Sequence, residues 1–276
     1  MHQNLLIDFH LNLLLLCAST VIGLVLGSFF NVVIGRYKSG QSIAYPASHC
    51  PKCNHVLRPW ENIPVLSYII LKAKCSSCGL PISIRYPLVE TLTGLAFGLI
   101  YYIYGYSLIT PYYMVMFSLL INLFFIDYDH YELPTWLNFP AIAVAVLGEV
   151  YIVGNSIEYA LTGALAGAGT FLLVYLIGRF LFKKEAMGVG DIILMGSLGA
   201  MTGAYMLPFL MVISGLYGIA THILFTILNR KNESECNVPV GAVPFGPSLI
   251  LSAITCIVFK AQFTSLFFKT LLFCAA

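Results

Sequence analysis

Long apolar runs separated by short polar segments dominate this chain. The first run covers residues 10–34, and seven more follow, at about 88–105, 108–127, 136–154, 157–182, 191–206, 208–228 and 247–272. A hydrocarbon core about 30 Å thick needs roughly 20 apolar residues for each helical crossing. The pattern therefore predicts an all-α polytopic membrane protein with about eight transmembrane helices.

Composition agrees with this pattern and excludes other classes of protein. Of the 276 residues, 59% are hydrophobic and only 9% are charged. The mean hydropathy of +0.88 is too high for a water-soluble globular protein of this length. The net charge of +2 is too small to indicate nucleic-acid binding. We therefore expect the lipid bilayer as a partner, and no nucleic acid.

A polar insertion at residues 35–87 separates the first apolar run from the others. Seven of the 14 Lys and Arg residues lie in it, between residues 36 and 85. Because basic loops stay in the cytoplasm, we expect the insertion there, and both termini outside after eight crossings. Three further segments should then also be cytoplasmic: 128–135, 179–190 and 229–246. The predicted domains are a first transmembrane helix (1–34), a cytoplasmic domain (35–87) and a seven-helix membrane domain (88–276).

Two acidic residues stand at the predicted cytoplasmic ends of apolar runs. Asp127 closes the third run, in FFIDYDHYELP, and Asp191 opens the sixth, in MGVGDIILMG. Either residue alone is explained by helix capping, but ionisable groups at membrane depth are costly and usually functional. Two carboxyl groups that share a proton activate water and polarise a peptide carbonyl. The pair therefore favours an aspartic hydrolase.

Neighbouring residues suggest supporting roles, and two other functions remain open. Gly188 and Gly190 carry no side chain and would let a substrate backbone approach Asp191 closely. Asp129 follows two residues after Asp127, past the predicted helix end and nearer water. The alternatives are an ion or proton-coupled transporter, in which the membrane aspartates relay protons, and an inactive assembly scaffold.

The insertion carries two C-x-x-C pairs with twenty-one residues between them. The four cysteines are Cys50, Cys53, Cys75 and Cys78. This spacing is typical of a structural zinc site with four thiolate ligands. Two reduced redox pairs or a disulfide framework are the alternatives, and a cytoplasmic location disfavours disulfides. His49 and His55 are close enough in sequence to be alternative ligands, but we expect them on the surface.

Seven stretches, in order along the chain, resemble the bacterial type IV prepilin leader peptidases, membrane aspartic proteases with a G-x-G-D signature. They are GSFFNVVIGR at 27–36, CPKC with CSSCG, ENIPVLSY at 61–68, ISIRYPLVE at 82–90, FFIDYDHYELP, GVGD, and PFGP at 244–247. The resemblance implies that Asp127, seven residues before Pro134, and Asp191 are catalytic and that Asp129 supports them. Thr135 departs from the acidic or amide residue common in the family.

The same resemblance implies a substrate and a second activity. The substrate is the N-terminus of a type IV prepilin or a secretion pseudopilin, whose basic leader ends in Gly before a hydrophobic helix. Cleavage occurs on the cytoplasmic side of the bacterial inner membrane, where Asp129 and Glu132 could dock the basic leader.

Family members with the cysteine-bearing insertion usually also transfer a methyl group from S-adenosylmethionine to the new N-terminal amine. Residues 35–87 contain no glycine-rich strand–turn–helix of the ordinary methyltransferase kind. The sequence therefore assigns no cofactor-binding residue, and it offers only polar candidates in or near the insertion: Glu61, Asn62 and Glu90.

Overall fold

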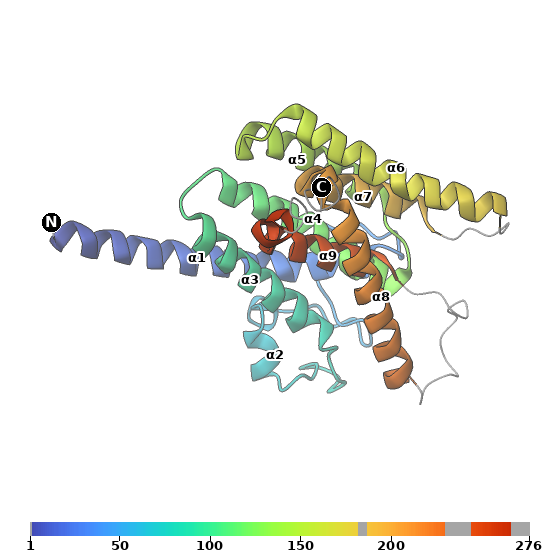
Figure 1. The fold of residues 1–276 in the computed structure, drawn as a ribbon. Helices are drawn as coiled ribbons and strands as arrows, with labels where there is room; N and C mark the ends of the chain where they lie inside the picture. The colour runs from blue at the N-terminus through green and yellow to red at the C-terminus, as the bar shows by residue number, and fades with distance from the viewer. Residues whose placement is uncertain (1, 182–186, 230–243, 266–276) are drawn as a thin grey trace, which may run out of the picture. The chain divides into compact units, whose positions relative to one another are not determined.

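The computed structural model describes residues 2–181, 187–229 and 244–265, with side chains for all but 2–9 and 224–229. Its helices are α1 (His2–Arg36), η1 (Pro59–Asn62), α2 (Leu66–Ile70), α3 (Arg85–Tyr104), α4 (Ile109–His130), α5 (Thr135–Gly148), η2 (Glu149–Val153), α6 (Ile157–Leu181), α7 (Val189–Thr202), η3 (Ala204–Met206), α8 (Leu207–Asn229) and α9 (Gly246–Val258) (Figure 1). These residues form two isolated β-bridges but no strand. The all-α prediction is confirmed.

Among the described residues, six helical segments are long and apolar enough to cross a membrane. They are His10–Arg36, Arg85–Tyr104, Ile109–His130, Thr135–Val153, Ile157–Leu181 and Ala204–Ile223. The other two predicted runs contain α7 and α9, which are apolar but only 14 and 13 residues long. At 1.5 Å per residue they extend about 20 Å, less than the hydrocarbon core. The protein is a polytopic membrane protein, and its last predicted run continues past α9 through residues 260–265, which are also helical, into residues outside the described part of the chain.

Parts of the predicted segments lie outside the described residues. The end of the last apolar run, residues 266–272, is among them. So are residues 182–186 and 230–243. They belong to two predicted cytoplasmic segments and include four of their basic side chains: Lys183, Lys184, Arg230 and Lys231.

The chain divides into two compact units, Met1–Asn122 and Leu123–Ala276. In the first unit α1 and α3 pack side by side (Figure 1). Two glycines four residues apart on each helix permit this contact, Gly23 and Gly27 on α1 and Gly94 and Gly98 on α3. A Cβ on Gly27 would lie 2.7 Å from the Glu90 Cα, and one on Gly94 would lie 2.7 Å from the Leu24 side chain. Membrane helices commonly pack closely through such small residues.

In the second unit α7 is packed against α5, α6 and α9. All of its residues from Leu194 to Thr202 are buried. Gly163 and Gly167 of α6 leave no room for a side chain, because a Cβ on Gly167 would lie 2.5 Å from the Met195 carbonyl oxygen of α7. Helix α7 is therefore surrounded largely by protein, which explains how a short helix fits among longer ones.

The insertion begins where α1 ends and returns to the membrane domain at α3. The nearly buried guanidinium of Arg36, the last residue of α1, donates hydrogen bonds of 2.6 Å to the carbonyl oxygens of Ser42 and Pro46. Two isolated β-bridges follow, His49 with Val56 and Lys74 with Pro81. Each bridge closes one C-x-x-C pair into a compact turn.

Candidate active site and candidate metal centre

Asp127 lies near the C-terminal end of α4 and is 5% exposed. The helix continues to His130, so the prediction that it ends at Asp127 is wrong. It stops because Tyr131 adopts a positive φ of 57° and donates its N–H to the Asp127 carbonyl oxygen. Residues two apart on a helix point about 200° apart around its axis. Asp129 therefore does not share the helix face of Asp127.

The carboxyl group of Asp127 accepts a hydrogen bond from a backbone group far away in the sequence. The N–H of Gly246, the first residue of α9, donates to Asp127 Oδ2 at 2.8 Å. A Cβ on Gly246 would lie 2.8 Å from the same oxygen. Only glycine gives the backbone this close an approach, so Gly246 belongs to the site.

Asp191 lies in the first turn of α7 and is held in a related way. Its Oδ2 accepts the N–H of Gly188, the N-cap residue of α7, at 3.2 Å. The carboxyl group of Asp191 is near enough to that of Asp127 for the two to interact electrostatically. Each acid therefore accepts a hydrogen bond at the start of a short helix, where the helix dipole favours negative charge.

Gly190 is held between two other residues of the second unit. A Cβ on Gly190 would lie 2.5 Å from the Leu133 Cβ, so Leu133 occupies the space that a side chain would need. Asn138 is fully buried in α5 and donates its Nδ2–H to the Gly190 carbonyl oxygen at 3.2 Å. By contrast, the nearest atom to a Cβ on Gly188 is 3.4 Å away.

The structure thus brings Asp127, Asp191, Gly188 and Gly190 into one site. Two residues that contact this site, Gly246 and Asn138, were not predicted from the sequence. Asn138 carried a usable signal, since an amide in the apolar stretch TWLNFPA is costly to bury without a partner. Gly246 gave no such signal beyond its place in PFGP, because every residue except proline has a backbone N–H and the sequence does not show which of them will donate to a side chain.

The four cysteines predicted to bind metal form one cluster. Their sulfur atoms all lie within 4.8 Å of one another, the Sγ atoms of Cys53 and Cys75 are 3.9 Å apart, and all four thiols are free. A tetrahedral zinc ion with Zn–S bonds of about 2.3 Å holds its sulfur ligands about 3.8 Å apart. The donor set and its spacing therefore fit a metal ion with four thiolate ligands.

Both C-x-x-C turns have the same backbone design. The N–H groups of Cys50 and Cys75 donate to the carbonyl oxygens of His55 and Leu80. The residue after each second cysteine, Asn54 or Gly79, has a positive φ of 57° or 70°. The backbone N–H groups of Cys78 and Ser77 lower the pKa of Cys75, which favours the thiolate form of that residue.

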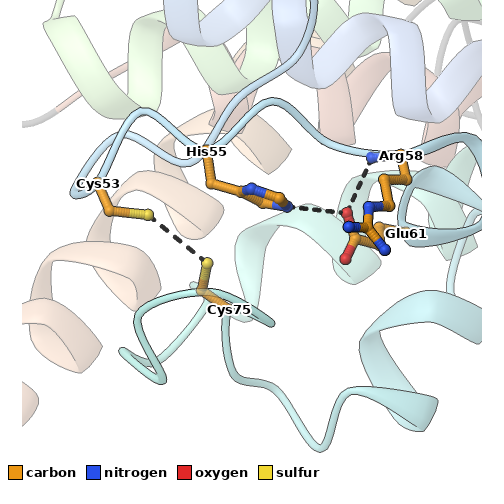
Figure 2. Close-up of polar contacts among 5 residues, drawn as sticks. All are labelled: Cys53, His55, Arg58, Glu61 and Cys75. Carbon is orange, nitrogen blue, oxygen red and sulfur yellow. Dashed lines mark hydrogen bonds and ion pairs between the residues drawn. The ribbon is translucent and has the colours of Figure 1, made fainter.

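The neighbouring histidines make other contacts. Figure 2 shows the His55 ring directed toward Glu61, 3.2 Å from Nε2 to Oε2, and not toward the sulfur atoms. His49 Nδ1 is 3.0 Å from the Ala47 carbonyl oxygen. The Arg58 N–H donates to Glu61 Oε2 at 2.8 Å. This bond, with contacts to Ser76 and His55, lowers the pKa of Glu61 to about 2.

Comparisons with known proteins identify two family domains in the chain. Residues 21–104 match the bacterial peptidase A24 N-terminal domain, and residues 114–223 match the type IV leader peptidase family. No solved structure matches the chain.

Several curated relatives are similar over most of their length. The prepilin leader peptidase/N-methyltransferase of Myxococcus xanthus is 38% identical over 81% of this chain and 68% of the relative. The proteins of that name from Neisseria gonorrhoeae and Stutzerimonas stutzeri are each 34% identical, over 85% and 91% of this chain and 87% and 92% of theirs. The chain therefore belongs to the type IV leader peptidase family.

Proposed function

We propose that the chain is a membrane aspartic endopeptidase that removes the basic leader of type IV prepilins or pseudopilins after its Gly. We also propose that it methylates the new N-terminal amine. The observation that carries the peptidase proposal is the pair Asp127 and Asp191, each held by a backbone N–H at the start of a short helix. The family match is to a peptidase and so supports this function rather than proton-coupled transport.

Water is the nucleophile in this proposal. Among the described residues each carboxyl group accepts one hydrogen bond, through Oδ2, so Oδ1 of each remains for water and substrate. Two neighbouring carboxyl groups share a proton. The charged one takes a proton from the attacking water while the neutral one polarises the scissile carbonyl, and the new N-terminal amine then leaves with a proton.

Substrate recognition follows from the groups around the pair. A Cβ on Gly188 would be in contact with Asp191 Oδ2, at 3.4 Å, and without that atom an extended substrate backbone can approach Asp191 closely. Asp129 is half-buried and Glu132 is exposed, and we propose that they dock the basic leader. Reversing the charge of either residue should raise KM for a leader peptide more than it lowers kcat. Loss of turnover with unchanged peptide binding would exclude docking.

Methyl transfer is proposed for the insertion, residues 35–87. The four cysteines bind a zinc ion. This ion is structural, because four thiolate ligands leave no coordination position open for a substrate or water. The methyl donor is S-adenosylmethionine. The amine nitrogen forms a bond to the methyl carbon as the sulfur–carbon bond breaks, and the amine proton goes to water.

The location of the enzyme follows from its basic residues. Seven of the 14 Lys and Arg residues lie between residues 36 and 85, which supports a cytoplasmic insertion between a first transmembrane helix and a seven-helix domain at 88–276. We propose an inner-membrane protein with both termini outside and the aspartate pair facing the cytoplasm.

The peptidase proposal is tested with the aspartates themselves. Purified wild type, Asp127→Asn and Asp191→Asn are incubated with a synthetic prepilin N-terminal peptide and S-adenosylmethionine, and Glu158→Gln, an exposed acid in the first turn of α6, is the control. Intact mass should show cleavage after the leader Gly by wild type and the control only, with one added CH₂ on the product. If either Asp127→Asn or Asp191→Asn still cleaves the peptide, Asp127 and Asp191 are not the catalytic pair.

A further inference from the structure

A cavity of about 600 Å³ lies in the first unit, between the C-terminal half of α1 and the part of the insertion from Ile43 to Pro64. Small-molecule sites are commonly about 300–1,000 Å³, with apolar walls and a few polar groups that orient the ligand. Val25, Phe29 and Val32 supply an apolar wall from α1, and Ser28, Arg36 and Asn62 supply polar groups. The cavity has the size and the lining of a ligand site.

Arg36 is the cationic group of this cavity. It is only 9% exposed, and it donates to the carbonyl oxygens of Ser42 and Pro46. A guanidinium carries five N–H donors, so Arg36 can hold the 42–46 loop over the cavity and still offer donors to an anionic group of a ligand.

Glu90 stands directly behind the polar side of the cavity. This carboxyl group of α3 is 8% exposed. It accepts the Val65 N–H at Oε2, at 2.7 Å, and it also contacts the hydroxyl of Ser28, which lines the cavity. A buried carboxyl group therefore lies one side chain away from the cavity and holds two of the groups beside it, the Ser28 hydroxyl and the Val65 N–H.

The backbone beside the cavity is strained at Val65. This residue has φ 62° and ψ −47°, a conformation that β-branched residues almost never adopt. It follows directly on Ile63 and Pro64, which line the cavity. Strained residues that the surrounding structure holds in place cluster at ligand and catalytic sites, and the bond from Val65 to Glu90 is the contact that holds this one.

We propose that this cavity binds S-adenosylmethionine, with Glu90 as a positioning residue that holds the 62–65 turn against it. This inference rests on the methyl transfer proposed above. The donor carries one carboxylate, an ammonium and a sulfonium beside a flat adenine ring. The carboxylate matches the guanidinium of Arg36, the ammonium matches the hydroxyl of Ser28 and the side-chain oxygen of Asn62, and the adenine ring matches the apolar wall of α1.

The test measures binding directly on the full-length purified protein. Equilibrium dissociation constants for S-adenosylmethionine and its non-reactive analogue sinefungin are obtained by calorimetry. Ala44→Phe and Val25→Trp fill the cavity from its two walls. Gln41→Phe and Val21→Trp are the matched controls: neither residue lines the cavity, and Val21 is 56% exposed against 55% for Val25. Leader cleavage, measured on each sample, shows that each variant is folded.

Both cavity-filling variants should raise the dissociation constant at least tenfold while both controls and all cleavage rates stay within twofold of wild type. If wild type binds and methylates but the filled variants bind equally well, the cavity assignment is overturned and the proposed function stands. If the filled variants have a raised KM for the leader peptide but an unchanged affinity for S-adenosylmethionine, the cavity binds the peptide, and the proposed S-adenosylmethionine site is wrong. A wild type that neither binds nor methylates overturns the methyl transfer itself.

Discussion

The most direct test of the aspartate site is the substitution Gly246→Ala. The N–H of Gly246 donates to Asp127 Oδ2 at 2.8 Å, and a Cβ at this position would lie only 2.8 Å from that oxygen and 3.3 Å from the Leu133 Cδ2. Because Asp127 is 5% exposed, its carboxyl group has little room to retreat. The added methyl group should separate the carboxyl group from its donor.

The magnitude follows from the hydrogen bond that is lost. A hydrogen bond to a charged group contributes about 1.5–3 kcal/mol, and each 1.4 kcal/mol corresponds to roughly a tenfold change in rate. If the bond holds Asp127 in its reactive position, Gly246→Ala should lower kcat by about 10- to 150-fold. KM should change little, because Gly246 contacts the carboxyl group of the enzyme.

The assay is cleavage of a leader peptide by the purified variant, followed by mass spectrometry over time. Gly169→Ala is the matched control, since a Cβ there meets nothing within 4 Å and the residue lies in the same unit. Thermal unfolding of both variants shows whether the fold is retained. A folded Gly246→Ala enzyme with a kcat within twofold of wild type would refute the role given to this backbone donor.

Three further predictions concern the support of the two sites. Asn138→Ala removes the bond to the Gly190 carbonyl oxygen, worth about 1 kcal/mol, so kcat should fall roughly fivefold; an unchanged kcat would contradict this. Glu61→Gln should weaken the insertion in urea at pH 7, followed by Trp60 fluorescence. Because the Glu61 pKa falls from 4.5 to about 2 on folding, the wild-type advantage should shrink below pH 4.5 and vanish near pH 2; an advantage independent of pH would exclude the ionised carboxylate. Elemental analysis should find one zinc ion per chain, and Cys53→Ser should lose it and expose the insertion to trypsin while leader cleavage continues. Equal resistance to trypsin would show that metal does not hold the insertion together.

The helices could be predicted because hydropathy and length are local properties of the sequence. A run of about 20 apolar residues has few alternatives to a helix in lipid. The same reasoning could not show that α7 is short and lies among other helices. A helix surrounded by protein is as apolar as one that faces lipid, and the burial of Leu194 to Thr202 depends on glycines in another helix.

The metal cluster was predictable for a similar reason. Cysteines at C-x-x-C spacing lie on one turn, so each half of the cluster is fixed locally. The role of the nearby histidines was settled by other contacts. The bond between His55 and Glu61 depends on the course of the chain through η1, which no short-range pattern records.

The sequence could not predict which backbone N–H groups hold the two aspartates. The bond from Gly246 to Asp127 spans 119 residues, and its donor has no residue-type signature. Gly188 gives Asp191 the equivalent bond. A glycine thus stands at the start of each short helix: Gly188 is the N-cap residue of α7, and Gly246 is the first residue of α9. The N–H of each glycine donates to one of the two catalytic carboxyl groups and holds it in place. The position of the reactive pair therefore depends on where α7 and α9 start.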